Sequence, residues 1–85
     1  MKTYKAIIRI SLRKGILDVQ GKTVENGLRS IGFNNISNVR IGRIVELNVE
    51  AEDKTAANNI VADACKKLIA NPIIEDFAVE IEDAK

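Results

Sequence analysis

Two hydrophobic periods alternate along the chain, and their order limits the folds that it can adopt. Apolar residues recur at every second position in residues 3–12, 39–49 and 77–81, as in a strand with one buried face. Residues 19–31 and 54–70 instead carry apolar residues three or four positions apart, which is the period of an amphipathic helix. The sequence therefore predicts the order β-α-β-α-β.

Residues at the expected helix ends agree with these boundaries. Asp18 and Asp53 each precede a helical segment, where a side-chain oxygen can accept a hydrogen bond from a free backbone amide. Gly32 follows the first segment and can take the left-handed conformation that ends a helix. Pro72 disfavours a helical conformation in the residue before it, so we expect the second helix to end at about Ala70.

These elements predict an α+β fold in a single domain, residues 1–85, with a three-stranded, mainly antiparallel sheet and both helices on one face. The first helix has an apolar stripe of Val24, Leu28 and Ile31, and Gly27 on the same side would let it approach the sheet closely. A sheet of three strands has two exposed edges, which invite pairing with another chain. We therefore expect oligomerisation to extend the sheet, as a homodimer or a higher homo-oligomer.

The second strand segment is unusual in two respects. It would be about twice the mean strand length, which suggests either a bend near Gly42 or a half that reaches beyond the chain's own sheet. Arg43 falls on the register that faces the core, where an unpaired guanidinium would be very costly. Either the strand bulges at Gly42, or Arg43 points toward another protein.

The sequence lacks the residues on which most catalytic sites depend. There is no histidine, and the single cysteine, Cys65, lies within the apolar stripe of the second helix, so we assign it to the core. The five glycines form no phosphate-binding motif. We therefore expect no catalytic, cofactor-binding or metal-binding residue in this chain.

Charge and composition argue against further classes of function. Thirteen basic and twelve acidic residues leave a net charge of +1, so no strong field attracts nucleic acid or anionic lipid. Tyr4, Phe33 and Phe77 are the only aromatic residues, too few for a base-stacking surface. Charged residues interrupt every apolar run, which argues against a membrane span, and a lone cysteine fits a reducing cytoplasm.

Three segments together resemble a known family. They are residues 13–21 with the sequence RKGILDVQG, residues 39–43 with VRIGR, and residues 65–75 with CKKLIANPIIE. In this order, and over essentially the whole length, the pattern is similar to PurS, the small subunit of phosphoribosylformylglycinamidine synthase. Two departures are visible, because the family usually has proline where this chain has Val19 and lysine where it has Arg43.

The resemblance implies a single PurS-like domain that serves as a non-catalytic subunit of a cytoplasmic, ATP-dependent and glutamine-using carbon–nitrogen ligase. In the family this subunit joins a glutaminase subunit, which releases ammonia, to a synthetase subunit, which makes the amidine in de novo purine (IMP) biosynthesis. It supports ammonia transfer and binds no cofactor itself, whereas the synthetase uses ATP and magnesium. The expected partner contacts lie in the three segments: Lys14, Gly15, Asp18, Gln20, Gly21, Arg43, Asn71, Pro72 and Glu75.

Two other classes of protein have a related organisation. A small-molecule-binding regulatory module of the ACT or ferredoxin-like type also alternates strands and helices, although it often uses a further strand. A small dimeric scaffold, such as a toxin–antitoxin component, would have the same open sheet edges, but no residue specifically supports it. Both readings stay open at the level of the sequence.

Overall fold

The protein is described by a computed structural model over residues 1–84. Three strands, two α-helices and one π-helical turn follow one another in the predicted order. They are β1 (Lys2–Leu12), α1 (Val19–Ser30), β2 (Gly42–Ala51), α2 (Lys54–Ala64), the π-helical turn η1 (Cys65–Ile69) and β3 (Glu75–Asp83).

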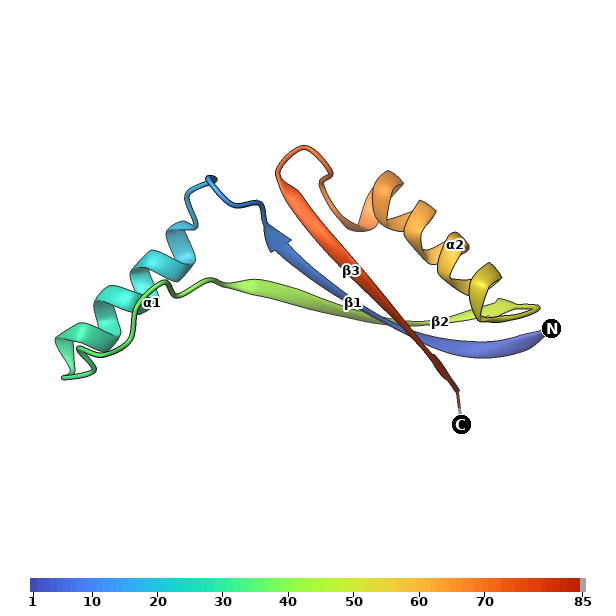
Figure 1. Cartoon of the computed structure of the whole chain (residues 1–85), viewed down its shortest axis with the longest axis horizontal. Helices are drawn as coiled ribbons and strands as arrows, with labels where there is room; N and C mark the ends of the chain where they lie inside the picture. The colour runs from blue at the N-terminus through green and yellow to red at the C-terminus, as the bar shows by residue number, and fades with distance from the viewer. Residues whose placement is uncertain (85) are drawn as a thin grey trace.

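The three strands form one antiparallel sheet with β1 in the centre, in the order β2-β1-β3 (Figure 1). Ile8 of β1 lies opposite Val45 of β2 and Val79 of β3, so the apolar residues of all three strands share one face. The predicted α+β class and the three-stranded antiparallel sheet are confirmed.

Helix α2 covers this apolar face and builds the core with it. Ile8 of β1 and Val61 and Cys65 of the helical segment are the largest side chains that are fully buried. The assignment of Cys65 to the core is thus confirmed. Asp53 caps α2 as predicted, because its Oδ1 atom accepts a hydrogen bond from the Ala56 amide at 2.7 Å.

The last turn of the second helical segment is wider than an α-helix. In η1 the Ala70 amide donates to the Cys65 carbonyl at 2.9 Å, a bond that spans five residues. The helical segment ends at Ala70, as the proline at position 72 predicts. The periodicity of the sequence does not distinguish this π-helical turn from a continued α-helix.

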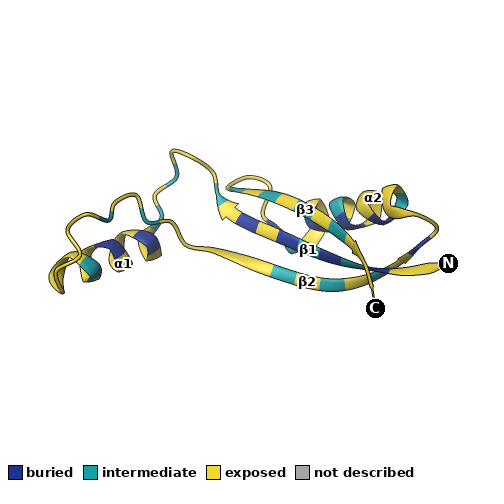
Figure 2. Ribbon diagram, turned by 60° about the horizontal axis from the view of Figure 1, so that its bottom comes forward, coloured by how far each residue is buried: buried dark blue, intermediate teal, exposed yellow. Residues whose placement is uncertain are grey.

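The position of α1 contradicts the prediction that both helices lie on one face of the sheet. Within residues 1–84, α1 lies beyond the end of the sheet and does not pack on it (Figures 1 and 2). Val24 and Ile31 of its apolar stripe are 42% and 71% exposed. A Cβ atom added at Gly27 would meet nothing within 4 Å, so the expected close approach to the sheet at this glycine is also wrong.

The reason for this position lies in the segment before β2. The sheet register ends with the pairs Ile10–Arg43 and Ser11–Gly42, so the strand predicted over residues 39–49 instead begins at Gly42 and continues to Ala51, with no bulge at Gly42 in the described structure. Residues 39–41 continue the line of β2 past the sheet and are hydrogen-bonded to α1 instead. Helix α1 therefore lies alongside residues 39–41, beyond the end of the sheet. This arrangement makes the molecule elongated, with extents of 52 × 29 × 14 Å.

Candidate partner interface

The three segments that resemble a family meet at one end of the sheet, where β1 ends and both β2 and β3 begin (Figure 1). Arg13 joins two of the segments. Its amide donates to the Ile74 carbonyl at 2.9 Å, its guanidinium donates to the Pro72 carbonyl, and its Nε atom lies 3.4 Å from an Asp76 oxygen. The loop after β1 and the loop before β3 are thereby held side by side.

Asp18 joins the start of α1 to the segment before β2. Its Oδ1 atom accepts a hydrogen bond from the Gly21 amide at 2.9 Å, which is the predicted helix cap. Its Oδ2 atom accepts from the Ile41 amide at 2.7 Å. These two backbone hydrogen bonds, assisted by the charge of Arg40, hold the pKa of Asp18 below its usual range.

Gly21 is required by the close contact between α1 and the same segment. A Cβ atom at this position would clash with the Val39 carbonyl and would lie 2.7 Å from an oxygen of Asp18. No side chain larger than hydrogen fits without a shift of the backbone. The helix and residues 39–41 are therefore packed backbone to backbone.

Glu25 is a second link between α1 and this segment, and the sequence reasoning missed it. Its side chain is only 9% exposed, and its Oε1 atom accepts a hydrogen bond from the Val39 amide at 3.1 Å. Arg29 and Lys22 lie 3.2 and 3.8 Å from its other oxygen. The Val39 amide and these two cations lower the pKa of Glu25. The i, i+3 and i, i+4 spacing of the three charged residues was visible in the sequence, but the contact with Val39 was not.

Arg43 has partners within its own chain. Its guanidinium donates to both carboxylate oxygens of Glu75, at 2.6 and 3.1 Å, and to the Ile69 carbonyl at 2.9 Å. The hydrogen bonds from Arg43, followed by one from the Asn71 amide, lower the pKa of Glu75. The argument that the register of Arg43 requires either a bulge or a contact with another protein was therefore wrong, because Glu75 neutralises it. Whether Arg43 also contacts a partner stays a prediction.

The predicted contact residues form one group with two exceptions. Asp18, Gln20, Arg43 and Glu75 line a shallow pocket of about 220 Å³. Gly21 and Asn71 are hydrogen-bonded to two of these lining residues, Asp18 and Glu75. Pro72 follows Asn71, and its carbonyl accepts a hydrogen bond from Arg13. Lys14 and Gly15 instead lie in the exposed turn after β1, where Gly15 has a φ of +89°.

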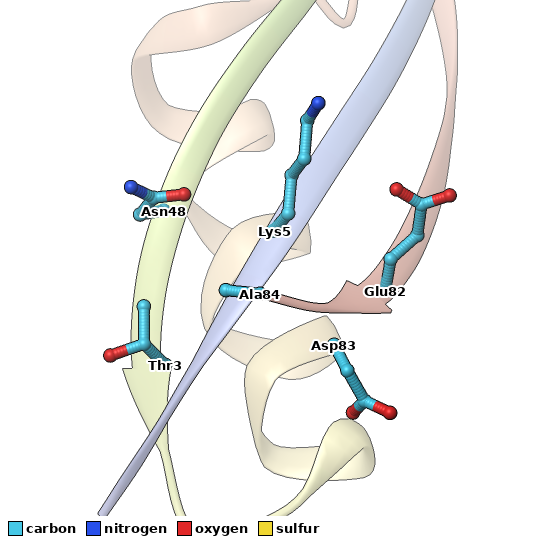
Figure 3. Close-up of a pocket in the computed structure, with 6 residues that line it drawn as sticks. All are labelled: Thr3, Lys5, Asn48, Glu82, Asp83 and Ala84. Carbon is cyan, nitrogen blue, oxygen red and sulfur yellow. The ribbon is translucent and has the colours of Figure 1, made fainter.

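A larger hollow lies at the opposite end of the sheet, on the face that α2 leaves open. It has a volume of about 660 Å³, and Figure 3 shows its lining residues: Thr3, Lys5, Asn48, Glu82, Asp83 and Ala84. Lys5 and Glu82 lie opposite each other on β1 and β3 and carry opposite charges. None of the predicted contact residues lies in this hollow.

The geometry of the candidate interface is that of a fixed surface. Among residues 1–84, no three or more His, Cys, Asp or Glu side chains are grouped so that they could hold a metal ion. Asp18 accepts hydrogen bonds from backbone amides, and Arg43 and Glu75 are paired with each other, which fixes the positions of these three charged groups. None of the helices in the described part of the chain is both long and apolar enough to cross a membrane.

Comparisons with known proteins agree on one family. The family model of PurS, described as phosphoribosylformylglycinamidine (FGAM) synthase, matches residues 5–83. The PurS subunit of phosphoribosylformylglycinamidine synthase from Bacillus subtilis is 39% identical over 80 residues, which are 94% of this chain and 94% of the relative.

Two solved structures are similar over nearly the whole chain. One is the crystal structure of Methanocaldococcus jannaschii PurS, a subunit of formylglycinamide ribonucleotide amidotransferase, with a TM-score of 0.87, 34% identity and coverage of 96% of this chain and 99% of its own. The other is a chain in the structure of PurLQS from Thermotoga maritima, with a TM-score of 0.87, 34% identity and coverage of 95% and 99%.

Proposed function

Because this chain belongs to the PurS family of phosphoribosylformylglycinamidine synthase subunits, we propose that it bridges the glutaminase and the ATP-dependent synthetase subunits of that enzyme. In this role it supports ammonia transfer in de novo purine biosynthesis and performs no chemical step itself. A regulatory module of the ACT type finds no support in the comparisons.

One observation carries the proposal. The three segments that resemble the family converge on a single end of the sheet, and ion pairs and backbone hydrogen bonds hold them there. A rigid surface of this kind suits the docking of other proteins, because little conformational freedom is lost on binding. The similar chain of Thermotoga maritima is found in PurLQS, which places a relative of this fold in a multi-subunit assembly.

A bridging subunit would increase the efficiency of ammonia transfer. Free ammonia is mostly protonated at neutral pH, so it loses its nucleophilic lone pair and diffuses away. A subunit that holds the glutaminase against the synthetase raises the effective concentration of ammonia at the second site without touching a substrate. The proposed contact surface comprises the nine predicted residues. Arg43 contributes through the half of its side chain that stays exposed, and Glu75, whose side chain is only 11% exposed, holds Arg43 in place.

Three further expectations belong to the same proposal. ATP and magnesium bind to the synthetase subunit, and this chain holds no cofactor. The complex works in the cytoplasm, where the free thiol of Cys65 stays reduced. The chain acts as a homodimer or a higher homo-oligomer.

Reconstitution tests the bridging role. The glutaminase and synthetase subunits are mixed with and without this chain, and amidine formation is measured with glutamine and, separately, with ammonium chloride as the nitrogen source. We expect this chain to raise the glutamine-dependent rate strongly and to leave the ammonium-dependent rate nearly unchanged. An equal effect on both reactions, or no effect on either, would refute the bridging function.

A further inference from the structure

Two large apolar side chains lie in the turn that leads from α2 to β3 (Figure 1) and stay outside the core. Leu68 and Ile73 are 87% and 80% exposed, and among the large apolar side chains of residues 1–84 only that of Met1 is more exposed. We call these two residues the anchor pair. Both belong to the segment 65–75 that resembles the family, so they adjoin the candidate interface.

The π-helical turn η1 is the reason why Leu68 faces outward. Leu68 follows Val61 by seven positions, so in an uninterrupted α-helix it would lie on the same, buried side. The hydrogen bond from the Ala70 amide to the Cys65 carbonyl widens the helix, and Ile69 packs against the core instead. The fold therefore exposes a leucine where the sequence period would bury it, and π-helical turns of this kind are frequent at functional sites.

Hydrogen bonds from the end of the sheet hold the backbone of this turn in place. The Arg43 guanidinium donates to the Ile69 carbonyl at 2.9 Å, and the Arg13 amide donates to the Ile74 carbonyl at 2.9 Å. A single exposed apolar residue is common on protein surfaces, but here two of them project from one anchored turn. Such a turn loses little conformational freedom when its apolar side chains enter a partner's pocket.

The charges beside the anchor pair indicate the chemistry of that pocket. Lys66 and Lys67 directly precede Leu68 and are exposed. Lys67 lies 3.0 Å from Asp63, whereas Lys66 takes part in no ion pair within residues 1–84. Half of the Arg43 side chain is exposed as well. An apolar pocket with a carboxylate at its rim would complement this surface, since complementary charges at the rim guide association.

A bridge needs a second surface, and the two surfaces differ in charge. Strand β3 carries five carboxylates in nine residues and no basic residue: Glu75, Asp76, Glu80, Glu82 and Asp83. An acidic strand suits the synthetase, because a subunit that binds ATP needs a positive field around its site. The anchor pair with its basic neighbours then suits the glutaminase, whose substrate glutamine has no net charge.

We infer that Leu68 and Ile73 insert into an apolar pocket, with a carboxylate at its rim, on the glutaminase subunit. The inference rests on the proposed bridging function and assigns the residues that contact one of the two partners. It adds to the nine predicted contact residues two apolar ones that provide the buried centre of the interface.

Two polar variants test the anchor pair. Leu68→Gln keeps a good helix former, and Ile73→Thr keeps a β-branched side chain. Because both side chains are exposed in the chain alone, both variants should keep the native midpoint of thermal unfolding. The matched control is Ile44→Thr, since Ile44 is 61% exposed and, next to the core residue Val45, faces the side of the sheet that α2 leaves open.

Affinity is measured by titrating each variant into fixed amounts of the two partner subunits and following glutamine-dependent amidine formation. We expect the apparent dissociation constant to rise about 10-fold in Leu68→Gln and in Ile73→Thr, as for residues at the centre of an interface. Ile44→Thr should keep the native constant. Unchanged constants in both anchor variants, or an equal loss in the control, would overturn the inference. So would an altered sedimentation of the anchor variants alone, which would assign the pair to a contact between copies of this chain.

Photo-crosslinking identifies the subunit that holds the anchor pair. A benzophenone-bearing amino acid replaces Leu68 in one sample and Ile44 in another, and both are irradiated with the two partner subunits present. We expect position 68 to crosslink to the glutaminase and position 44 not to do so. A crosslink from position 68 to the synthetase or to a second copy of this chain would overturn the inference.

The same samples separate this inference from the bridging function. If the native chain stimulates glutamine-dependent amidine formation but position 68 does not crosslink to the glutaminase, the anchor contact is refuted and the bridge stands. If position 68 crosslinks to the glutaminase but the native chain gives no stimulation, the anchor contact stands and the bridge is refuted. Neither a crosslink nor stimulation would refute both.

Discussion

Two glycines of the same helix should respond in opposite directions when each is replaced by alanine. In α1, alanine is favoured over glycine by about 0.5–1 kcal/mol, because glycine loses more backbone freedom on folding. At Gly27 a Cβ atom meets nothing within 4 Å, so Gly27→Ala should stabilise the helix by that amount. At Gly21 the new atom clashes with the Val39 carbonyl and lies 2.7 Å from Asp18 Oδ2.

The clash at Gly21 should outweigh the gain in helix propensity. The new Cβ atom would lie 2.7 Å from Asp18 Oδ2, and an ordinary van der Waals contact between them is at least 3.4 Å, so the carboxylate must move away by about 0.7 Å. A retreat of that size stretches its 2.7 Å hydrogen bond with the Ile41 amide to about 3.4 Å, which is beyond the normal range. Overpacking costs about 1–3 kcal/mol, and a clash with the backbone carbonyl of Val39, which cannot rotate away, belongs to the upper part of this range, about 2–3 kcal/mol. Gly21→Ala should therefore destabilise the attachment of α1 by about 1–2 kcal/mol net.

Hydrogen exchange measures this difference directly, because α1 can open without the core. The protection of α1 amides should rise about 2- to 5-fold in Gly27→Ala and fall about 5- to 30-fold in Gly21→Ala, since 1.4 kcal/mol corresponds to a factor of ten. The amides of α2 serve as the internal control and should keep their native protection in both variants. Equal protection of α1 in the two variants would show that the contact between Gly21 and Val39 does not hold the helix.

Three further outcomes follow from individual contacts. Arg43→Ala should lower the midpoint of thermal unfolding by a few degrees, because Glu75 loses its bidentate partner, and Arg43→Lys should restore part of the loss; an unchanged midpoint in Arg43→Ala would contradict the role of the pair. The pKa values of Asp18 and Glu25 are lowered from 3.8 and 4.5, so the stability they provide is complete above these values and is lost as the pH falls through the folded-state values. Protection of α1 amides should decrease below about pH 4.5 in the native chain, and this decrease should be weaker in Asp18→Asn and Glu25→Gln, whereas an identical acid response would speak against both links. Burial raises the pKa of the Cys65 thiol, so its reaction with a thiol reagent at pH 8 should proceed only at the rate of unfolding; rapid labelling of the folded chain would refute its placement in the core.

Local chemistry determined the elements of the fold at the level of the sequence. The alternation of apolar residues around Ile8, Val45 and Val79 predicted the three strands, because a strand with one buried face has a period of two. Asp18 and Asp53 marked the starts of both helices, because capping depends only on residues a few positions apart. The resemblance over three short segments was enough to predict the family, since it requires residue types and order but no coordinates.

Tertiary structure decided what each apolar face and each charge contacts. An amphipathic stripe shows that a helix has a side to cover but does not show what covers it, so α1 was placed on the sheet when it lies beyond the sheet's end. Arg43 seemed unpaired because Glu75, its partner, lies 32 residues away in the sequence. Glu25 was overlooked because its burial depends on Val39, 14 residues away. Periodicity and capping report on neighbours along the chain, whereas burial and ion pairing depend on distances that only the folded chain defines.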